Sequence, residues 1–383
     1  MSAQRHAEIA GAGFAGLTAG VALAQRGWSV RIHEASRELR AFGAGIFIWE
    51  NGLRVLAALG AYREVIAGAH EAISYETRHD GRLIAEYRFT PDQGTRMLTM
   101  TRQHLYAALL RAARREGIDI VVGSEVTGAT PAGSLITADG RQFQADLVIG
   151  ADGVRSKVRD SLGLLQERNI YSDGIVRVLA PRLKDELGPG AWDHVIDFWN
   201  MQPRPLRILY VPCNEQDLYL AMMAPVADKE ATAIPLRTDI WIEAFPQLAP
   251  VIYKLTVGGR YDAYETTKLS RWSAGNVAIV GDAAHAMTPT LGQGAGTAMM
   301  NALALAVALE TTRCVPSALQ GWEKRERTLT EYTQDCSAQI ANERRLSRWD
   351  PETLRTANHI PTGTEHFGPL VGIGGKPQGG SVE

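Results

Sequence analysis

The chain contains 383 residues, 45% of them hydrophobic, so it exceeds one ordinary domain and can bury a large core. Forty Lys and Arg residues against 42 Asp and Glu residues give a formal charge of -2, which leaves no field of one sign to attract nucleic acid or anionic lipid. The charge therefore favours a small-molecule partner over nucleic acid or a membrane. The three cysteines, Cys213, Cys314 and Cys336, are far apart and odd in number, which argues against a disulfide framework or a thiolate metal site.

The sequence shows neither an export signal nor a membrane-spanning stretch, so we expect a cytoplasmic protein. The N-terminus runs through Arg5 and His6 directly into strand-like residues, without the charged and then apolar regions of an export signal. The longest apolar stretch, residues 302–309, is too short to span a bilayer.

The N-terminal pattern predicts a strand, a helix and a second strand. Residues 17–25 have helical periodicity and end at Gly27, and alternating apolar residues at Val30 and Ile32 indicate the next strand. Glu8 is unusual, because a buried parallel strand is normally apolar throughout. Further α/β elements are predicted at 102–115 (helix), 119–122 (strand), 145–150 (strand), 276–280 (strand) and from about Gly294 (helix).

Two intervening segments have a different pattern. Residues 73–89 and 175–267 show hairpin-like alternation with Pro and Gly between the runs, which predicts an antiparallel sheet. The sequence thus predicts an α/β fold with a discontinuous Rossmann-like domain and an antiparallel β-sheet domain for substrate. We expect the first domain at 1–72, 98–174 and 268–345, the second at 73–97 and 175–267, and a C-terminal segment at 346–383 whose glycine-rich end, from 361, is loose.

A glycine-rich motif, Gly-Ala-Gly-Phe-Ala-Gly at residues 11–16, lies between the first strand and its helix. Gly11 would permit the tight turn, Gly13 the approach of a pyrophosphate, and Gly16 close packing of helix on strand, while the helix N-terminus stabilises phosphate charge. Glu34 ends the next strand, 23 residues after Gly11, where an acid holds ribose hydroxyls and repels a 2′-phosphate. This context predicts a site for FAD or NAD.

Two shorter motifs follow buried strands, where α/β sheets place ligands. One is Gly-Ala-Asp-Gly at 150–153; the other is Gly-Asp-Ala-Ala-His at 281–285, followed by Pro289 and the glycine-rich run 292–296. Asp282 could accept hydrogen bonds from a polyhydroxyl chain, and backbone amides of that run could face the pyrimidine edge of an isoalloxazine, where reduction places negative charge. Each short motif alone is typical of an ordinary turn.

The order of these three motifs over some 280 residues resembles the class A flavoprotein aromatic hydroxylases, the group that includes para-hydroxybenzoate hydroxylase. The resemblance implies a GR2-type FAD domain above a substrate-binding sheet, with Glu34 on the FAD ribose, Arg102 near the pyrophosphate and Asp282 on the ribityl chain. The residues predicted to hold FAD are Gly11, Gly13, Phe14, Ala15, Gly16, Glu34, Arg40, Gly45, Arg102, Asp152, Gly281, Asp282, Gly292, Gln293, Gly294 and Ala295.

Within that group, the amino-acid sequence at 40–46, 51–56, 207–215 and 264–269 is most similar to that of the 2-methyl-3-hydroxypyridine-5-carboxylate oxygenase type. That type hydroxylates a 3-hydroxypyridine carboxylate beside the ring hydroxyl and opens the ring in the same site. The residues that this resemblance places at the substrate are Phe47, Tyr75, Arg177, Arg207, Tyr219, Tyr264 and Pro289, with Arg207 and Tyr219 in the catalytic positions. Phe47 departs from the family's Tyr, which removes a hydroxyl that could bond the substrate.

The residues themselves support part of this assignment. If strands around Arg207 and Tyr219 form a hairpin with its loop at 214–216, Val211 pairs with Tyr219 and Arg207 with Met223, so that a cation and a phenol share one face. An anionic ring substrate would need such a cation. A strand Arg is otherwise typical of a solvated edge and a strand Tyr of half-buried packing.

The resemblance implies that NADH or NADPH binds transiently and reduces tightly bound FAD, and that O2 then gives a C4a-hydroperoxyflavin that attacks the ring. A phenolic or hydroxybenzoate substrate without ring cleavage stays open, as do an NAD-dependent dehydrogenase, a flavin-binding regulator and a homodimer. A halogenase is disfavoured because no WxWxIP segment is present, and the chain has neither GxSxG nor HExxH, which argues against hydrolase and zinc chemistry. No metal site is predicted. We expect His285 to be a structural hydrogen-bond partner, and Trp192 and Trp199 to be core or pocket wall.

Overall fold

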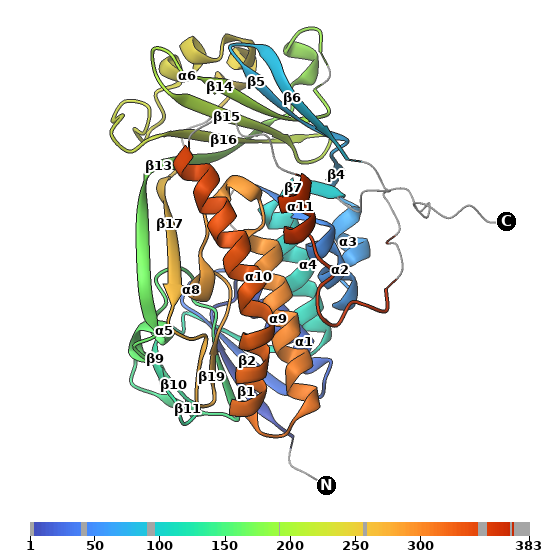
Figure 1. The fold of residues 1–383 in the computed structure, drawn as a ribbon, viewed down its shortest axis with the longest axis vertical. Helices are drawn as coiled ribbons and strands as arrows, with labels where there is room; N and C mark the ends of the chain where they lie inside the picture. The colour runs from blue at the N-terminus through green and yellow to red at the C-terminus, as the bar shows by residue number, and fades with distance from the viewer. Residues whose placement is uncertain are drawn as a thin grey trace, which may run out of the picture.

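The computed structural model describes residues 4–39, 44–89, 96–190, 192–255, 259–343, 351–367 and 370. Two bodies are visible in Figure 1: a lower one of helices around a parallel sheet, and an upper one built on a large second sheet. Strands β13 (Leu165–Pro181) and β17 (Tyr261–Leu269) run from the lower body into the upper one, and the end of helix α10 (Val315–Glu343) reaches the upper sheet.

The lower sheet has the strand order β18-β19-β12-β1-β2-β8, and every pair except β18 with β19 is parallel. Its central strands carry the apolar runs from which they were predicted. The bounds are β1 His6–Ala10, β2 Ser29–Glu34, β8 Asp119–Val122, β12 Leu147–Gly150, β18 Ser273–Ala274 and β19 Val277–Ile279. The predicted parallel sheet is therefore present, with the C-terminal ends of β1 and β12 side by side.

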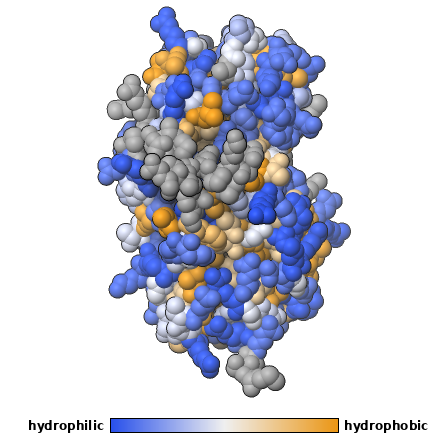
Figure 2. Space-filling model, turned by 90° about the vertical axis from the view of Figure 1, so that its right-hand side faces the viewer, coloured by the Kyte–Doolittle hydropathy of each residue, from blue (hydrophilic) through white to orange (hydrophobic). Residues whose placement is uncertain are grey.

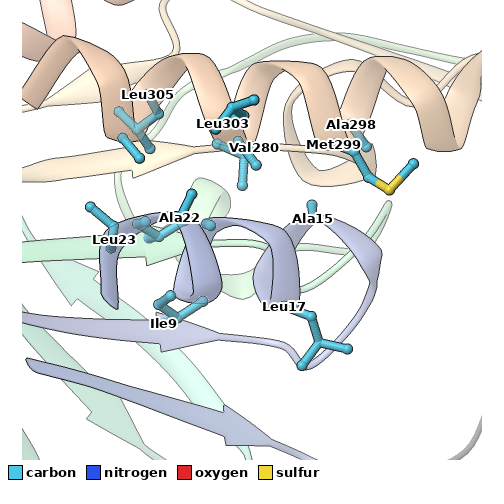
Figure 3. Close-up of a cluster of buried hydrophobic side chains, with 14 of the residues drawn as sticks. Ile9, Ala15, Leu17, Ala22, Leu23, Val280, Ala298, Met299, Leu303 and Leu305 are labelled. Carbon is cyan, nitrogen blue, oxygen red and sulfur yellow. The ribbon is translucent and has the colours of Figure 1, made fainter. Parts of the chain in front are cut away.

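Helix α1 (Phe14–Ala24) is buried between the sheet and helix α9 (Gly294–Thr311), as Figure 3 shows. Small residues on α1, such as Ala15 and Ala22, face Ala298 and Leu303 of α9, so the two helices approach closely. Helix α4 (Arg102–Arg115) packs on α1, and α10 (Val315–Glu343) packs on α9. The bounds of α4 and the start of α9 match the predictions, whereas α10 was not predicted separately.

The unusual acid of β1 has its partners inside the protein. Glu8 is 2% exposed and accepts hydrogen bonds from His33 (2.8 Å) and His6 (2.9 Å). Burial alone would raise the pKa of this carboxyl, but these two imidazoles outweigh burial and lower it. Glu8 is therefore a satisfied buried acid that ties β1 to β2.

The upper sheet has the strand order β17-β13-β16-β15-β14-β5-β6. It is antiparallel, as predicted, except for the parallel pair of β5 and β14. The bounds are β5 Ser74–His79, β6 Arg82–Arg88, β13 Leu165–Pro181, β14 Val195–Asn200, β15 Leu206–Pro212, β16 Asp217–Pro225 and β17 Tyr261–Leu269. Side chains alternate between its two faces, so one face packs on helices α6 (Thr238–Ala244) and α7 (Ala249–Ile252) and the other faces the lower body.

Smaller elements complete the fold. They are two sheets of order β3-β7-β4 and β11-β10-β9, helices of one to three turns and, within the described residues, three short 3-10 helices. The bounds are β3 Gly45–Trp49, β4 His70–Glu71, β7 Met97–Thr101, β9 Val126–Thr130, β10 Ser134–Thr137, β11 Gln142–Gln144, α2 Glu50–Ala58, α3 Tyr62–Ile66, α5 Lys157–Ser161, α8 Asp282–His285, α11 Pro351–Ala357, η2 Lys184–Glu186, η3 Pro246–Leu248 and η4 Pro289–Leu291.

The predicted domain limits at 174 and 267 fall inside strands. Residue 174 lies within β13 and residue 267 within β17, and these two strands run together from the lower body into the upper sheet (Figure 1). The segment 175–267, expected as sheet, also contains α6 and α7. Most of the predicted loose tail after 361 lies outside the described residues.

Hydrophilic side chains dominate the face seen in Figure 2, with hydrophobic ones scattered among them. Within the described ranges, no helix is both long and apolar enough to cross a membrane.

Candidate active site

The glycine turn between β1 and α1 has the geometry of a phosphate cradle. Gly11 has a φ of 96°, and its amide donates to the His33 carbonyl at 2.7 Å. A Cβ on Gly16 would lie 1.9 Å from the Gly11 carbonyl oxygen, whereas a Cβ on Gly13 would meet no atom within 4 Å in the described structure. The first and third glycines are thus required by packing, and the second leaves the backbone open to a ligand. Among the described residues no side chain caps α1, so its first amides are available to an anion.

Glu34 lies beside this turn at the end of β2. Its carboxylate accepts hydrogen bonds from the Ala12 amide (2.9 Å) and the Ser36 amide (2.8 Å). These bonds hold the carboxylate against the glycine turn and leave lone pairs for a ribose diol, which is the place predicted for it.

The Asp-Gly motif after β12 lies against the same turn, but its acid has a local role. A Cβ on Gly11 would lie 2.4 Å from the Ala151 carbonyl oxygen, so the two loops touch. The Asp152 carboxylate accepts from the Ser156 hydroxyl (2.5 Å) and the Lys157 amide (2.7 Å) at the start of α5. Asp152 therefore caps a helix and shapes the loop, and a direct bond to FAD stays a prediction.

The third motif meets the first through its glycine. Gly281 has a φ of 63°, and a Cβ there would lie 2.7 Å from the Ala15 Cβ. Asp282 follows with an exposed side chain at the wall of the site. The protein atoms crowded around this solvent-accessible carboxyl weaken its hydration and so raise its pKa, and the nearby Arg102 and Arg177 partly offset this.

Arg102 begins α4 and connects the glycine turn to Asp282. Its guanidinium lies over the Phe14 ring, 5.0 Å from the centroid, and its amide donates to the Ala44 carbonyl at 2.7 Å. Burial lowers the pKa of Arg102, and Arg177 lowers it further, while Asp282 raises it. Arg102 therefore lies close to both Phe14 and Asp282, and contacts of these three residues with FAD stay a prediction. Arg40 lies outside the described residues.

The glycine-rich run before α9 packs on strand β3. Gly292 has a φ of 63°, and a Cβ there would lie 2.9 Å from Cδ2 of Phe47, while Trp49 donates its indole N–H to the Leu291 carbonyl at 3.2 Å. Gln293 is buried and accepts from Asn51 at 3.0 Å, and its own Nε2 has no partner among the described residues. No described side chain caps α9, which begins at Gly294 and Ala295, so amides at this helix start are available to an acceptor.

These observations fit FAD. The open amides beside Gly13 suit its pyrophosphate, Glu34 its ribose, Asp282 its ribityl chain, and the α9 start the electron-rich edge of the reduced isoalloxazine.

The predicted hairpin has the predicted register. Val211 pairs with Tyr219 and Arg207 with Met223, and the loop is 214–216. Because Arg177 pairs with Ala221, its side chain lies on this same face, which is the one directed at the lower body. Tyr75 and Tyr264 belong to the same buried cluster as Tyr219.

Arg207, predicted as a cation for an anionic ring, is itself paired with an acid. Its Nε donates to Oδ1 of Asp197 at 2.6 Å and its Nη2 to Oδ2 at 2.9 Å. Oδ2 of Asp197 also accepts from the Tyr75 hydroxyl (3.0 Å) and the Trp199 indole N–H (2.8 Å), and the Trp199 ring lies 4.7 Å below the guanidinium. Asp197 was missed by the sequence analysis. The sequence feature that could have identified Asp197 is the one noted for Glu8: an acidic residue inside an otherwise apolar strand.

Asp197 changes the charge of the site. Burial alone would lower the pKa of Arg207, but the Asp197 carboxylate outweighs burial and raises it, so the guanidinium stays charged and paired. Burial also raises the pKa of Tyr75, and the neighbouring Asp197 adds to this. Both phenol and guanidinium therefore act as hydrogen-bond donors held by one carboxylate.

A second group of polar side chains surrounds Arg177. Arg177 donates to Asp262 at 3.3 Å, and both side chains are about one-third exposed. Burial raises the pKa of the Tyr219 hydroxyl and of the Tyr264 hydroxyl, while Arg177 lowers both. These tyrosines are therefore neutral hydrogen-bonding groups at neutral pH.

The other predicted residues lie at the boundary of the two bodies or have packing roles. A Cβ on Gly45 would lie 2.4 Å from the Tyr219 Cβ, so Gly45 lets β3 contact the upper sheet. Phe47 is half-buried on β3, and Pro289 is exposed at the start of η4. His285 is 2% exposed and bonds Asn301 at 3.1 Å; burial lowers its pKa to about 4, so it is a neutral structural residue as expected.

Of the two tryptophans predicted as core or pocket wall, one has each position. Trp192 belongs to the core behind the upper sheet, and Trp199 lines a pocket. Over the described part of the chain, no group of three or more His, Cys, Asp or Glu residues is arranged to hold a metal ion.

Comparison with known proteins agrees with this geometry. The model of the FAD binding domain family matches residues 5–344. The chain is 41% identical to a putative 2-heptyl-3-hydroxy-4(1H)-quinolone synthase of Rhodococcus erythropolis, over 89% of each chain, and 37% identical to the 2-heptyl-3-hydroxy-4(1H)-quinolone synthase of Mycobacteroides abscessus, over 97% of this chain and 95% of that one.

Among solved structures, a crystal structure of 2-methyl-3-hydroxypyridine-5-carboxylic acid oxygenase is 49% identical, with a TM-score of 0.90 over 93% of this chain and 96% of that one. A tetrameric form of that oxygenase is similar as well, with a TM-score of 0.89. The chain therefore belongs to the FAD binding domain family and is an FAD-dependent monooxygenase of the aromatic hydroxylase type, which uses NAD(P)H and O2.

Proposed function

We propose that the substrate is a hydroxylated N-heteroaromatic of the 3-hydroxypyridine carboxylate type, such as 5-hydroxynicotinate or its 6-methyl analogue, and that ring opening follows hydroxylation. The enzyme would act in the cytoplasm with NADH or NADPH as the transient reductant. A homo-oligomer is part of the proposal, because the similar oxygenase has a tetrameric form.

One observation carries this proposal: polar side chains on the inner face of the upper sheet, the face directed at the lower body, form two groups that could hold opposite ends of one small ring. Arg207 and Tyr75, fixed by Asp197, form one group, and Arg177 with Tyr219 forms the other. Arg177 is bonded to the Tyr219 hydroxyl and, at 3.3 Å, to Asp262, and the ion pair with Asp262 is about one-third exposed, so Arg177 is the cation better able to bind a carboxylate.

The relatives support the same ring class. The solved oxygenase is named for a substrate with a six-membered nitrogen heterocycle that carries a hydroxyl at position 3, and the two synthases are named for a product in which such a ring is fused to a benzene ring. These relatives differ in the other substituents of the ring. The proposal that the substrate carries a carboxylate is therefore supported by the cations described above and by the similarity to the oxygenase.

FAD supplies the oxygen chemistry when it is bound and reduced. The task of the protein is then to orient the ring, stabilise the ring hydroxyl as it gives up electron density, and exclude water. Tyr219 and Tyr264 are neutral donors that can bond a ring oxygen, and Arg207 and Arg177 can hold the ring plane. No side chain needs to act as an acid or base in this scheme.

The test is NAD(P)H consumption and product mass with 5-hydroxynicotinate and its 6-methyl analogue. A product heavier by two oxygens and two hydrogens supports hydroxylation with ring opening. A gain of one oxygen removes the ring opening, and the absence of any substrate-stimulated NAD(P)H oxidation would overturn the proposed substrate class.

A second candidate is hydroxylation of a quinolone without ring cleavage. The two synthases that are 41% and 37% identical favour it, as does the pairing of Arg207 with Asp197, which leaves less free positive charge. The same assay with a 4-quinolone decides between the two, because that product gains a single oxygen.

A further inference from the structure

A pocket opens between the inner face of the upper sheet and the C-terminal end of α10, which reaches up to this sheet in Figure 1. Arg207, Met223 and Tyr264 line it where it meets the proposed ring site. Trp199 and Leu206 continue one wall, and Ala341 of α10 lies in the other. The pocket is therefore continuous with the proposed ring site but is formed partly by an element, α10, that the predicted substrate residues do not include.

Several of the polar groups that line this pocket are already bonded to other protein groups, and the Asp173 carboxylate and the Tyr264 hydroxyl also lie in its lining. Arg207 and the Trp199 indole N–H are both held by Asp197, and the Thr290 hydroxyl donates to the Ser337 carbonyl at 2.6 Å. Much of the remaining lining comes from apolar residues, such as Met201, Pro205 and Met223. A ligand that enters here meets mainly apolar lining beyond Tyr264 and Asp173, which favours an apolar occupant over a polar or charged one.

We propose that this pocket binds an apolar substituent of the ring substrate, for which an unbranched alkyl chain is the simplest example. The inference rests on the proposed function for the position of the ring and extends it to the shape of the substrate. Continuity with Arg207 and Tyr264 identifies the occupant, because a group that reaches the pocket from the ring site must be attached to the ring. An apolar chain buried against Trp199, Met223 and Leu206 gains affinity with each methylene.

The first experiment measures binding to the FAD-loaded protein of 5-hydroxynicotinates with hydrogen, methyl, propyl or pentyl at position 6. Quenching of tryptophan fluorescence gives the Kd of each compound. We expect Kd to fall about threefold to fourfold for each added methylene, the value of burying one CH2. A Kd that is constant or rises along the series would overturn the inference.

The second experiment narrows the pocket from the side of α10. The variant Ala341→Phe places a large ring in the pocket wall, and Asn342→Phe is the matched control, because the adjacent Asn342 is exposed and is not part of the lining. We expect Ala341→Phe to remove most of the preference for pentyl over hydrogen, while Asn342→Phe keeps it. Equal preferences in the two variants count against the pocket, and the wild-type series stands as the test if Ala341→Phe does not fold.

The two proposals fail in different ways. If 5-hydroxynicotinate is turned over and chain length has no effect on Kd, the proposed function stands and the pocket inference fails. If longer chains bind more tightly but no compound is oxidised, the pocket inference stands and the proposed ring substrate is wrong.

Discussion

The carboxylate of Asp197 meets the guanidinium of Arg207 edge to edge, with Nε to Oδ1 at 2.6 Å and Nη2 to Oδ2 at 2.9 Å. The side chains are 5% and 16% exposed, so the pair is shielded from water and its geometry is fixed. This pair organises the inner face of the upper sheet, because Tyr75 and Trp199 bond to the same carboxylate.

Loss of one partner of this pair should be costly. We expect Asp197→Asn to lower the free energy of unfolding by about 3 kcal/mol, because the charge of Arg207 stays buried without its counter-ion. Asp262→Asn is the matched control: it removes the partner of Arg177, but that pair is about one-third exposed, so its loss should cost less than about 1 kcal/mol. Urea unfolding of both variants gives the comparison, and equal losses would show that the Asp197 pair has no special role.

Arg207 should determine how much NAD(P)H is used productively. In Arg207→Ala the ring is no longer held in place, so we expect kcat/KM to fall on the order of 10²-fold and hydrogen peroxide to replace product. Arg207→Lys keeps the charge but loses the bidentate contact with Asp197. Its kcat/KM should lie between those of the wild type and Arg207→Ala. Product yield per NAD(P)H is the measurement, and an unchanged yield in Arg207→Ala would remove this residue from the substrate site.

The glycine turn should be intolerant of one methyl group at a specific position. In Gly16→Ala the new Cβ would lie 1.9 Å from the Gly11 carbonyl, so the turn must move and FAD should be lost. Gly20→Ala is the control in the same helix, because its Cβ would meet only side-chain methyl carbons, the nearest of them 3.1 Å away on Ile32. Flavin absorbance of the purified variants tests this, and a fully yellow Gly16→Ala protein would contradict the assignment of the turn.

His285 should make the protein sensitive to mild acid. Its pKa falls from an ordinary value of 6.5 to about 4 in the folded state, because burial disfavours the imidazolium. The unfolded chain therefore binds the proton more readily between these values, and stability should decline as pH falls from 6.5 toward 4, by about 3 kcal/mol in total.

The variant His285→Gln separates this contribution from that of other groups. Glutamine keeps a hydrogen-bonding side chain near Asn301 but does not titrate, so its stability should depend less on pH across this window. The measurement is the free energy of unfolding at pH 7, 6, 5 and 4. Parallel curves for the variant and the wild type would show that His285 does not contribute.

Local sequence was sufficient for much of the cofactor side of the molecule. The glycines of residues 11–16 need particular backbone geometry, and Glu34 must end the following strand, so their roles can be inferred from spacing alone. The bounds of α4 followed from its periodicity, and the register of Arg207 with Met223 followed from loop length, because a hairpin relates its strands over a few residues.

Tertiary structure decided what those residues do on the substrate side. Asp197 reaches Arg207 from the neighbouring strand β14 and Tyr75 reaches Asp197 from β5, more than 100 residues earlier, so no local pattern could show that the cation is paired. The packing of α10 against the sheet, which forms the apolar pocket, is equally non-local. Sequence determines the conformation of short turns and strands through steric limits and alternation, whereas the charge and shape of this site arise from side chains that only folding brings together.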